Sequence, residues 1–190
     1  MTVAVDQRGR ILDAALRLMA EQGSVGASMR QLAAACDLNV ATLYHYFPSK
    51  ADLLESVVRE RRYGERLEVD RPPLDPTVPP RERLVSLLDW LWANALEEQA
   101  VWRLLIGEAV RNEAAATVAA AEVVELLGAT LEGWLTTGFP ELTGDPAVLA
   151  RVVRGQVFAL VVEHLALGGV TRDVARLRAE ELAGVLLPSG

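Results

Sequence analysis

The chain has 190 residues, of which 51% are hydrophobic and 24% are charged, and its formal net charge is −7. A single cysteine excludes an intramolecular disulfide and favours a reducing cytoplasm. Asp13 and Arg17 interrupt the first apolar run, and no uncharged apolar run reaches the roughly 18 residues of a membrane-spanning helix. We therefore expect a soluble, cytoplasmic protein without a signal peptide or a membrane partner.

The negative charge argues against a nucleic-acid partner, but it is unevenly distributed. Residues 1–53 contain five basic and five acidic side chains, so the other 14 basic and 21 acidic residues carry the whole excess. A neutral N-terminal segment on an acidic body can still bind DNA. It predicts modest non-specific affinity and few phosphate contacts.

The first helix is predicted from Asp6 to Gln22, where apolar residues recur at intervals of three and four, and Gly23 is the expected C-cap. Arg8 and Arg10 near its start are candidates for phosphate contacts. Solvated charges at a helix end explain these two arginines equally well.

Two short capped helices follow. Ser28 and Gln31 form a capping-box pattern that opens a helix ending near Cys36, and Asp37 is expected in a left-handed turn. Asn39 is the predicted N-cap of the second short helix. Leu43 and Phe47 should face inward from it, Pro48 ends it, and Ser49 with Asp52 caps the next helix. This pattern is typical of a helix-turn-helix, whose second helix enters the DNA major groove.

The run T-L-Y-H-Y-F-P-S-K-A-D-L-L, preceded by Arg30 and by L-A-A-A-C-D-L-N, resembles the N-terminal domain of the TetR family of transcriptional regulators. The resemblance covers roughly residues 8 to 58. Asp37 stands where the family usually has glycine, and Tyr46 stands where it often has histidine, with His45 one residue earlier. The resemblance implies a helix-turn-helix head in residues 1–48 and a larger helical body in residues 49–190 that binds a ligand and dimerises.

Base contacts are expected at the start of the second short helix and on the helix before it. Val40 and Ala41 are small enough to meet a thymine methyl, Thr42 could donate or accept, and Arg30 suits a bidentate contact with guanine. The resemblance implies phosphate contacts from this segment. Lys50, the only lysine, also lies at a helix N-terminus, where main-chain amides and the helix dipole favour a phosphate. A core position is an equally open interpretation of Tyr44. The predicted DNA-binding set is Ser28, Arg30, Asn39, Val40, Ala41, Thr42, Tyr44, His45, Tyr46 and Lys50.

The remainder of the chain is predicted to be helical. The helix that opens at Ser49 should continue to about Leu67, and residues 70–80, with five of the nine prolines, should form an extended connector. Asp145 and Thr171 are expected N-caps further on. Helical apolar spacing follows the connector over residues 81–96, 98–111, 113–136, 146–167 and 172–187. The fold class is therefore all-α, with about nine helices.

Aromatic residues in the body suggest a ligand pocket. The candidate ligand-binding residues are Trp90, Trp102, Trp134, Phe158, Glu163 and His164. Plain core positions explain the tryptophans equally well, and an ion pair or a solvent-facing position explains Glu163 and His164.

Apolar stripes on the last two predicted helices suggest a subunit interface. The stripe on the first of them begins at Val148 and Leu149, but the candidate interface leaves out position 149, where the residue is leucine and not valine. An intrachain core is the alternative for every member. The candidate dimer interface contains Val152, Val153, Leu160, Val161, Val174, Leu177 and Leu182.

The sequence gives little support for catalysis. His45 and His164 are far apart, no cluster of residues has metal-ligand spacing, and Cys36 is best explained as a small buried residue. We expect no cofactor. The first hypothesis is a ligand-responsive homodimeric repressor that a small apolar effector releases from a palindromic operator on double-stranded DNA. The alternative is an all-helical small-molecule-binding module, or an activator without DNA binding in the absence of ligand, which the acidic balance favours.

Overall fold

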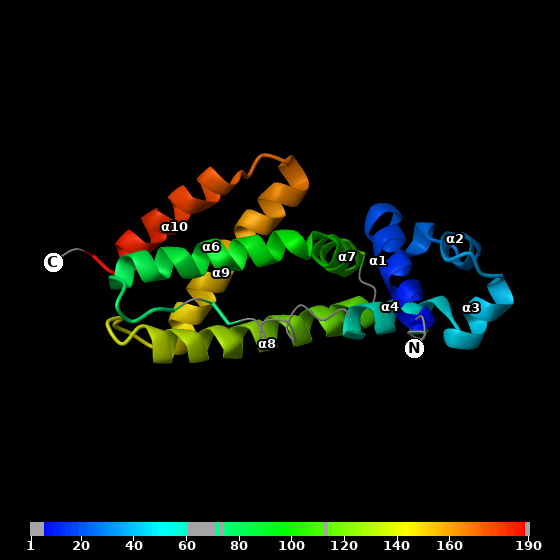
Figure 1. Cartoon of the computed structure of the whole chain (residues 1–190), viewed down its shortest axis with the longest axis horizontal. Coiled ribbons are helices and arrows are strands. Elements are labelled where there is room, and N and C mark those ends of the chain that lie inside the picture. The colour runs from blue at the N-terminus through cyan, green and yellow to red at the C-terminus, as the bar shows by residue number, and fades with distance from the viewer. Residues whose placement is uncertain (1–5, 61–70, 73, 112–113, 189–190) are drawn as a thin grey trace, which may run out of the picture. The chain divides into compact units, whose positions relative to one another are not determined.

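The computed structural model describes residues 6–60, 71–72, 74–111 and 114–188, and these residues form nine α-helices and no strand (Figure 1). The all-α prediction and the expected number of helices are therefore confirmed. No helix among the described residues is long and apolar enough to cross a membrane. The helices are α1 (Gln7–Gly26), α2 (Met29–Ala35), α3 (Val40–Tyr46), α4 (Lys50–Glu60), α6 (Pro80–Glu97), α7 (Gln99–Val110), α8 (Ala114–Gly138), α9 (Pro146–Leu167) and α10 (Arg172–Leu186).

The chain divides into two compact units, one of residues 1–63 with 100–123 and the other of residues 64–99 with 124–190. The first unit thus contains α4 and α7 in addition to α1, α2 and α3. The boundary expected after residue 48 is a functional division between head and body, and it stays a prediction. The continuation of the helix from Ser49 towards Leu67 lies outside the described residues beyond Glu60.

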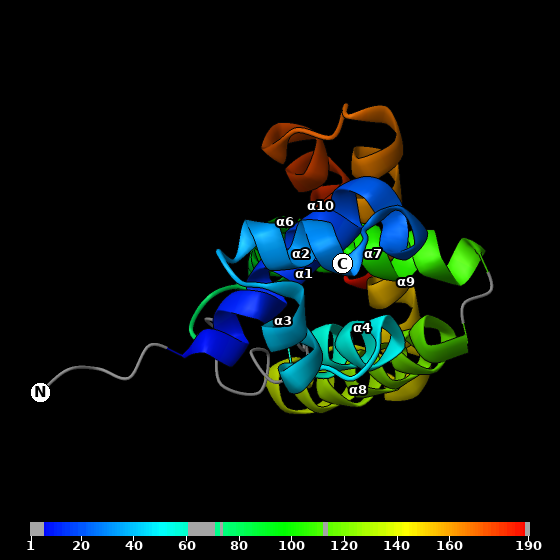
Figure 2. The same cartoon turned by 90° about the vertical axis from the view of Figure 1, so that its right-hand side faces the viewer.

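In the first unit, α1 contacts α2 and α4, and α2 contacts α3 (Figure 2). The apolar stripe of α1 is buried as its spacing predicted, and the short helices add Leu32, Leu43 and Phe47 to the same core. Burial raises the pKa of the Cys36 thiol, as befits a small core side chain.

The predicted end of α1 was wrong. Gly23 adopts φ 76° and ψ 160°, but another helical turn follows it to Gly26, and Ala27 is the C-cap. The glycine therefore kinks α1 instead of ending it, because only a residue without Cβ adopts this conformation readily.

In the second unit, α6 packs against both α9 and α10. Arg83 at the start of α6 is buried and pairs with Glu141, and its guanidinium also donates to the main-chain oxygens of Pro76 and Val78. Its guanidinium carbon lies 5.0 Å from the centre of the Phe139 ring. One arginine thus holds the segment before α6 and the loop after α8 together.

The burial on α9 corrects part of the expected dimer interface. Val153, Leu160 and Val161 are 0%, 4% and 4% exposed, so they belong to the intrachain core. Val152 and Leu177 are exposed, whereas Val174 and Leu182 are half-buried. The apolar stripe is wider than one contact face needs, because α9 has apolar residues both on the face that packs into the core and on the exposed face.

Position 149, at the start of α9, was left out of the expected interface. The residue at this position is a leucine, Leu149, and not a valine. Its main-chain N–H donates to the carbonyl oxygen of Asp145 at 3.1 Å in the first turn of the helix, and its side chain is half-buried. Leu149 thus lies between the exposed Val148 and the buried Ala150, and its omission from the interface stays a prediction.

Candidate nucleic-acid interface

The turn between α2 and α3 is built by main-chain hydrogen bonds and two caps. Ser28 and Gln31 form the complete capping box of α2, and the Asn39 side chain accepts from the main-chain N–H of Thr42 at 2.7 Å. Asp37 between them has φ 56°, as predicted, and the N–H of Leu38 closes the turn onto the carbonyl of Ala33 at 2.9 Å. These local bonds fix the direction in which α3 leaves the turn.

α3 separates its residues between core and solvent. Leu43 is buried, Val40 and Thr42 are half-buried, and the exposed residues are Ala41, Tyr44, His45 and Tyr46. Tyr44 is 46% exposed, which excludes the core interpretation of this residue. The rings of His45 and Tyr46 meet edge to face with their centres 5.9 Å apart. The helix therefore presents small side chains near its start and aromatic polar side chains near its end.

The basic side chains beside α3 differ in how many hydrogen bonds and ion pairs they make within the protein. The Arg30 guanidinium on α2 is exposed and has no hydrogen bond or ion pair with another described residue. Lys50 Nζ donates to the Val25 carbonyl oxygen at 3.3 Å, which leaves two of its three hydrogens free to bind an anion. Arg8 pairs with Glu60 and lies over the Phe47 ring, so its charge is used within the unit.

The hydroxyl groups at the helix N-termini of this segment donate hydrogen bonds to nearby side chains. Ser28 Oγ donates to Gln31 Oε1 at 2.7 Å, and Ser49 Oγ donates to Asp52 Oδ2 at 2.8 Å. Thr42 Oγ1 donates to Asn39 Oδ1 at 2.9 Å. Since each hydroxyl carries one hydrogen, Ser28 would have to give up the bond that it donates to Gln31 Oε1 in order to donate to a phosphate.

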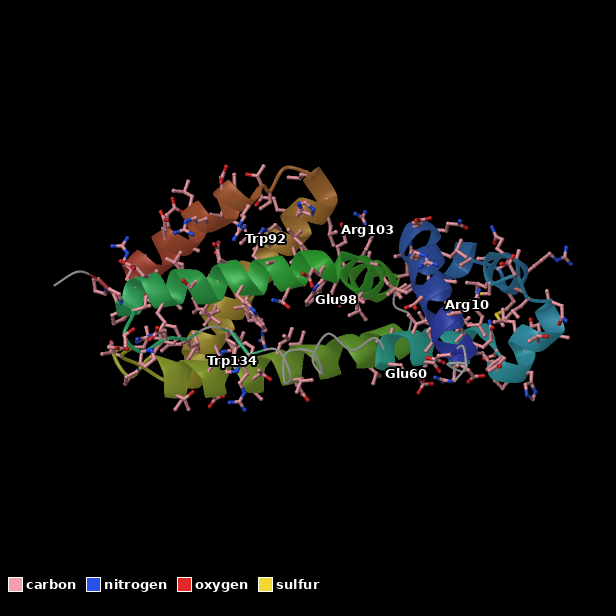
Figure 3. The ribbon with its side chains drawn as sticks, in the orientation of Figure 1. Arg10, Glu60, Trp92, Glu98, Arg103 and Trp134 are labelled. Atoms are coloured by element: carbon pink, nitrogen blue, oxygen red, sulfur yellow. The ribbon has the colours of Figure 1, made fainter. Side chains whose placement is uncertain are left out.

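Two of the expected ligand-binding residues meet in the body. The rings of Trp90 on α6 and Trp134 on α8 lie edge to face at 5.5 Å, and Figure 3 labels Trp134 there. On the other side of α6, the rings of Trp92 and His164 also lie edge to face, at 5.6 Å. Trp92 is buried, and its Nε1 has no hydrogen-bond partner among the residues that the structure describes.

The other three ligand candidates lie elsewhere. Trp102 is buried on α7 in the first unit, and Phe158 is exposed on α9. Glu163 accepts two hydrogen bonds from Arg178, at 2.6 and 3.1 Å, so an ion pair accounts for its place in an apolar helix. The structure thus brings Trp90 and Trp134 together and places Trp102 in the other unit.

A buried polar group in the first unit was not predicted. Glu108 on α7 is 0% exposed, and it accepts hydrogen bonds from the N–H and hydroxyl of Ser24 at 2.8 and 2.6 Å and from Arg111 at 2.7 Å. A polar cavity of about 500 Å³ adjoins it between the end of α1 and α7, with Arg103 and Gly107 in its lining. A lone carboxylate in the apolar stretch around residue 108 was the available signal, but nothing in the sequence indicated Ser24 as its partner.

Comparisons with known proteins give the family. The sequence pattern of "Bacterial regulatory proteins, tetR family" matches residues 11–57. The chain is 30% identical over 185 residues to the HTH-type transcriptional repressor KstR of Rhodococcus jostii, covering 97% of this chain and 84% of KstR.

Solved structures agree on the fold. A putative TetR-family transcriptional regulator from Mesorhizobium loti has a TM-score of 0.80 at 22% identity, covering 98% of both chains. AibR, in a complex with isovaleryl coenzyme A and operator DNA, has a TM-score of 0.65 at 23% identity, covering 97% of this chain and 100% of that one. With its helix-turn-helix and its match to KstR along almost its whole length, the chain belongs to the TetR family of bacterial transcriptional regulators.

Proposed function

We propose that the chain is a homodimeric repressor that binds a palindromic operator and that a small, largely apolar effector releases. The observation that carries the proposal is the exposed face of α3, with Arg30 and Lys50 beside it, in a chain that resembles the repressor KstR over 97% of its length. Arg30 would contact guanine, and Lys50 with the aromatic residues of α3 would contact phosphates. Base contacts specify the operator, whereas phosphate contacts fix the register.

Exposed apolar residues on α9 and α10 support a dimer. Val148, Val152 and Val162 lie at helical spacing on α9 and are exposed, and Gly155 and Ala159 between them are small enough for close helix approach. Leu177 and Val185 are exposed on α10. A two-fold axis through such a face would place two heads on DNA. Its operator would then be palindromic, with half-sites roughly 34–36 Å apart or a multiple of that distance.

An effector site in the body is supported by the tryptophans of α6 and α8. Trp90 and Trp134 form an aromatic pair that would present an apolar surface to the ligand. AibR was solved with both a small molecule and operator DNA, so this fold accommodates both kinds of partner. The effector would act by favouring a conformation whose heads no longer match the operator.

The test is a DNA-binding titration with genomic fragments, including the fragment that flanks the chain's own gene, in the presence of competitor DNA. We expect one fragment to bind specifically, and Arg30→Ala to abolish that binding. Arg103→Ala is the matched control, since Arg103 is an exposed arginine on α7, outside the helix-turn-helix. Equal loss in both variants, or no specific fragment with or without candidate ligands, would contradict the repressor.

The second candidate is a helical ligand-binding protein, or an activator that binds DNA only when loaded. The net charge of −7 and the small number of free cations near α3 favour it. The same titration separates the two candidates, because an activator would bind the fragment only after a ligand is added.

A further inference from the structure

The N-cap of α3 settles which role the Thr42 hydroxyl can play. Asn39 Oδ1 accepts from the main-chain N–H of Thr42 at 2.7 Å and from Thr42 Oγ1 at 2.9 Å. The first bond identifies the amide oxygen, because the NH₂ group of Asn39 would face the N–H unfavourably in the flipped orientation. The hydrogen of the second bond must therefore be the one on the Thr42 hydroxyl. Its oxygen remains as an acceptor only.

Such an oxygen has no partner on the phosphate backbone. Phosphate oxygens are acceptors, so two acceptors would meet and no hydrogen bond could form. In the major groove, guanine N7 and O6, adenine N7 and thymine O4 are also acceptors. The available donors are the exocyclic amino groups, N6 of adenine and N4 of cytosine.

Thr42 is placed to meet a base edge. It is the third residue of α3 and is half-buried, and the residues that recognition helices direct to base edges come from their N-terminal part. Its neighbours Val40 and Ala41 have short side chains without hydrogen-bonding groups. They would not compete with Thr42 for the amino group.

Resting on the proposed function, we infer that Thr42 determines specificity at one operator base pair by accepting a hydrogen bond from an amino group. Thr42 would then favour the base pair that presents its amino group, N6 of adenine or N4 of cytosine, at the place in the major groove that the hydroxyl oxygen reaches, over a pair that presents an acceptor there. Asn39 is the positioning residue, since it fixes the hydroxyl hydrogen. Losing a single hydrogen bond of this kind corresponds to a roughly three- to tenfold loss of affinity.

The first experiment locates the base pair. Randomised variants of the bound operator are selected with the full-length chain and with Thr42→Val, which keeps the branched shape and removes the hydroxyl. We expect the preference to relax at one base pair per half-site, and the exocyclic amino group of that pair, N6 of adenine or N4 of cytosine, is then the candidate donor. Relaxation at no base pair would overturn the inference.

The second experiment removes the amino group alone. Purine replaces adenine, or 2-pyrimidinone replaces cytosine, at the located position of the operator. The unaltered protein should bind this operator about three- to tenfold more weakly, and Thr42→Val should bind both operators equally. An unaltered protein that binds the deaminated operator as tightly as the original would contradict the inference.

Asn39→Gly tests the positioning role, because glycine at an N-cap costs the helix little while it frees the hydroxyl to rotate. Selection with this variant should also admit, at the same base pair, the pair that presents an acceptor in place of the amino group, and an unchanged preference would contradict the inference. Failure to select any operator with the unaltered protein would instead contradict the proposed repressor and this inference with it. A selected operator that is bound equally well with and without the amino group contradicts the inference alone.

Discussion

At the scale of single residues, the buried Glu108 links two distant parts of the sequence within the first unit. Its carboxylate is completely buried, and three hydrogen bonds compensate for the lost hydration. Two of them come from Ser24, 84 residues away in the sequence. The kink at Gly23 turns Ser24 towards α7, so the backbone of α1 and this carboxylate depend on each other.

Ser24→Ala removes the hydroxyl that donates to Glu108 and leaves the main-chain bond in place. A hydrogen bond to a charged group contributes about 1.5–3 kcal/mol, so we expect the free energy of unfolding to fall by about that amount. Urea titration at one fixed protein concentration measures it, because an oligomer would make the result depend on concentration. Ser86→Ala is the control, since Ser86 is exposed and its hydroxyl donates to the Glu82 carbonyl in its own helix, and its effect should stay within about 0.5 kcal/mol. Equal effects of the two variants would contradict the role of Glu108.

Glu141 should make stability depend on pH. Its hydrogen bonds from Arg83 hold the pKa of the Glu141 carboxyl below the ordinary value of 4.5. A depressed pKa in the folded state means that the stabilisation is complete above the ordinary value and is lost as the pH falls through the folded value. Glu141→Gln should therefore unfold at lower urea than the unaltered chain at pH 7, and the difference should shrink below about pH 4.5. If the difference in urea unfolding stays constant down to pH 3, the effect of the substitution comes from packing and not from the charge of Glu141.

At the scale of elements, local chemistry made the short helices predictable. Ser28, Asn39 and Thr171 cap their helices as expected, and Asp37 takes the left-handed conformation, because these signals act between residues at most three apart. The kink at Gly23 was missed because glycine after an apolar stripe usually ends a helix. Ser24, the residue after the kink, is held by hydrogen bonds to Glu108. A partner so distant in the sequence leaves no pattern in the residues around Gly23.

The same limit explains α9. Its sequence shows which residues are apolar, but it does not show which of them pack against α6. Val152 and Val153 are adjacent valines, and only the fold makes one exposed and the other buried. The exposed residues of α3 were easier to predict, since this helix is short and Leu43 and Phe47 fix its inner face.

Gly23→Ala should destabilise the chain at the kink. A φ of 76° with a ψ of 160° is strained for any residue with a Cβ, and that Cβ would meet the Arg111 guanidinium at 3.0 Å. Such backbone strain costs on the order of 1–3 kcal/mol. Gly133→Ala is the matched control inside α8, where the added Cβ meets nothing within 4 Å and should stabilise the helix by up to about 1 kcal/mol. Thermal unfolding of both variants checks the opposite signs, and a neutral Gly23→Ala would contradict the kink.

For the whole molecule, the exposed stripe on α9 predicts how to separate the subunits of the proposed dimer. Val152→Asp places a charge in the proposed dimer face without disturbing the core, unlike a charge at the buried Val153. We expect a monomer by light scattering that keeps its helical circular dichroism. Val110→Asp is the control, because Val110 is an exposed valine on α7, outside the face. If Val152→Asp remains dimeric, the interface lies elsewhere.

The salt dependence of DNA binding then reports how many heads touch the operator. Each phosphate neutralised by a cation adds about 0.9 to the slope of log K against log salt concentration. Lys50 is the only lysine, and its two free hydrogens make it the expected phosphate contact of each head. Lys50→Gln should therefore reduce the slope by roughly 1.8 if both heads of a dimer are engaged, and by about 0.9 if only one is. Arg103→Gln should leave the slope unchanged, and an unchanged slope in Lys50→Gln would remove Lys50 from the interface. Because Val152→Asp should yield monomers, its complex should show the smaller change when Lys50→Gln is added, which ties the phosphate contact to the dimer in one measurement.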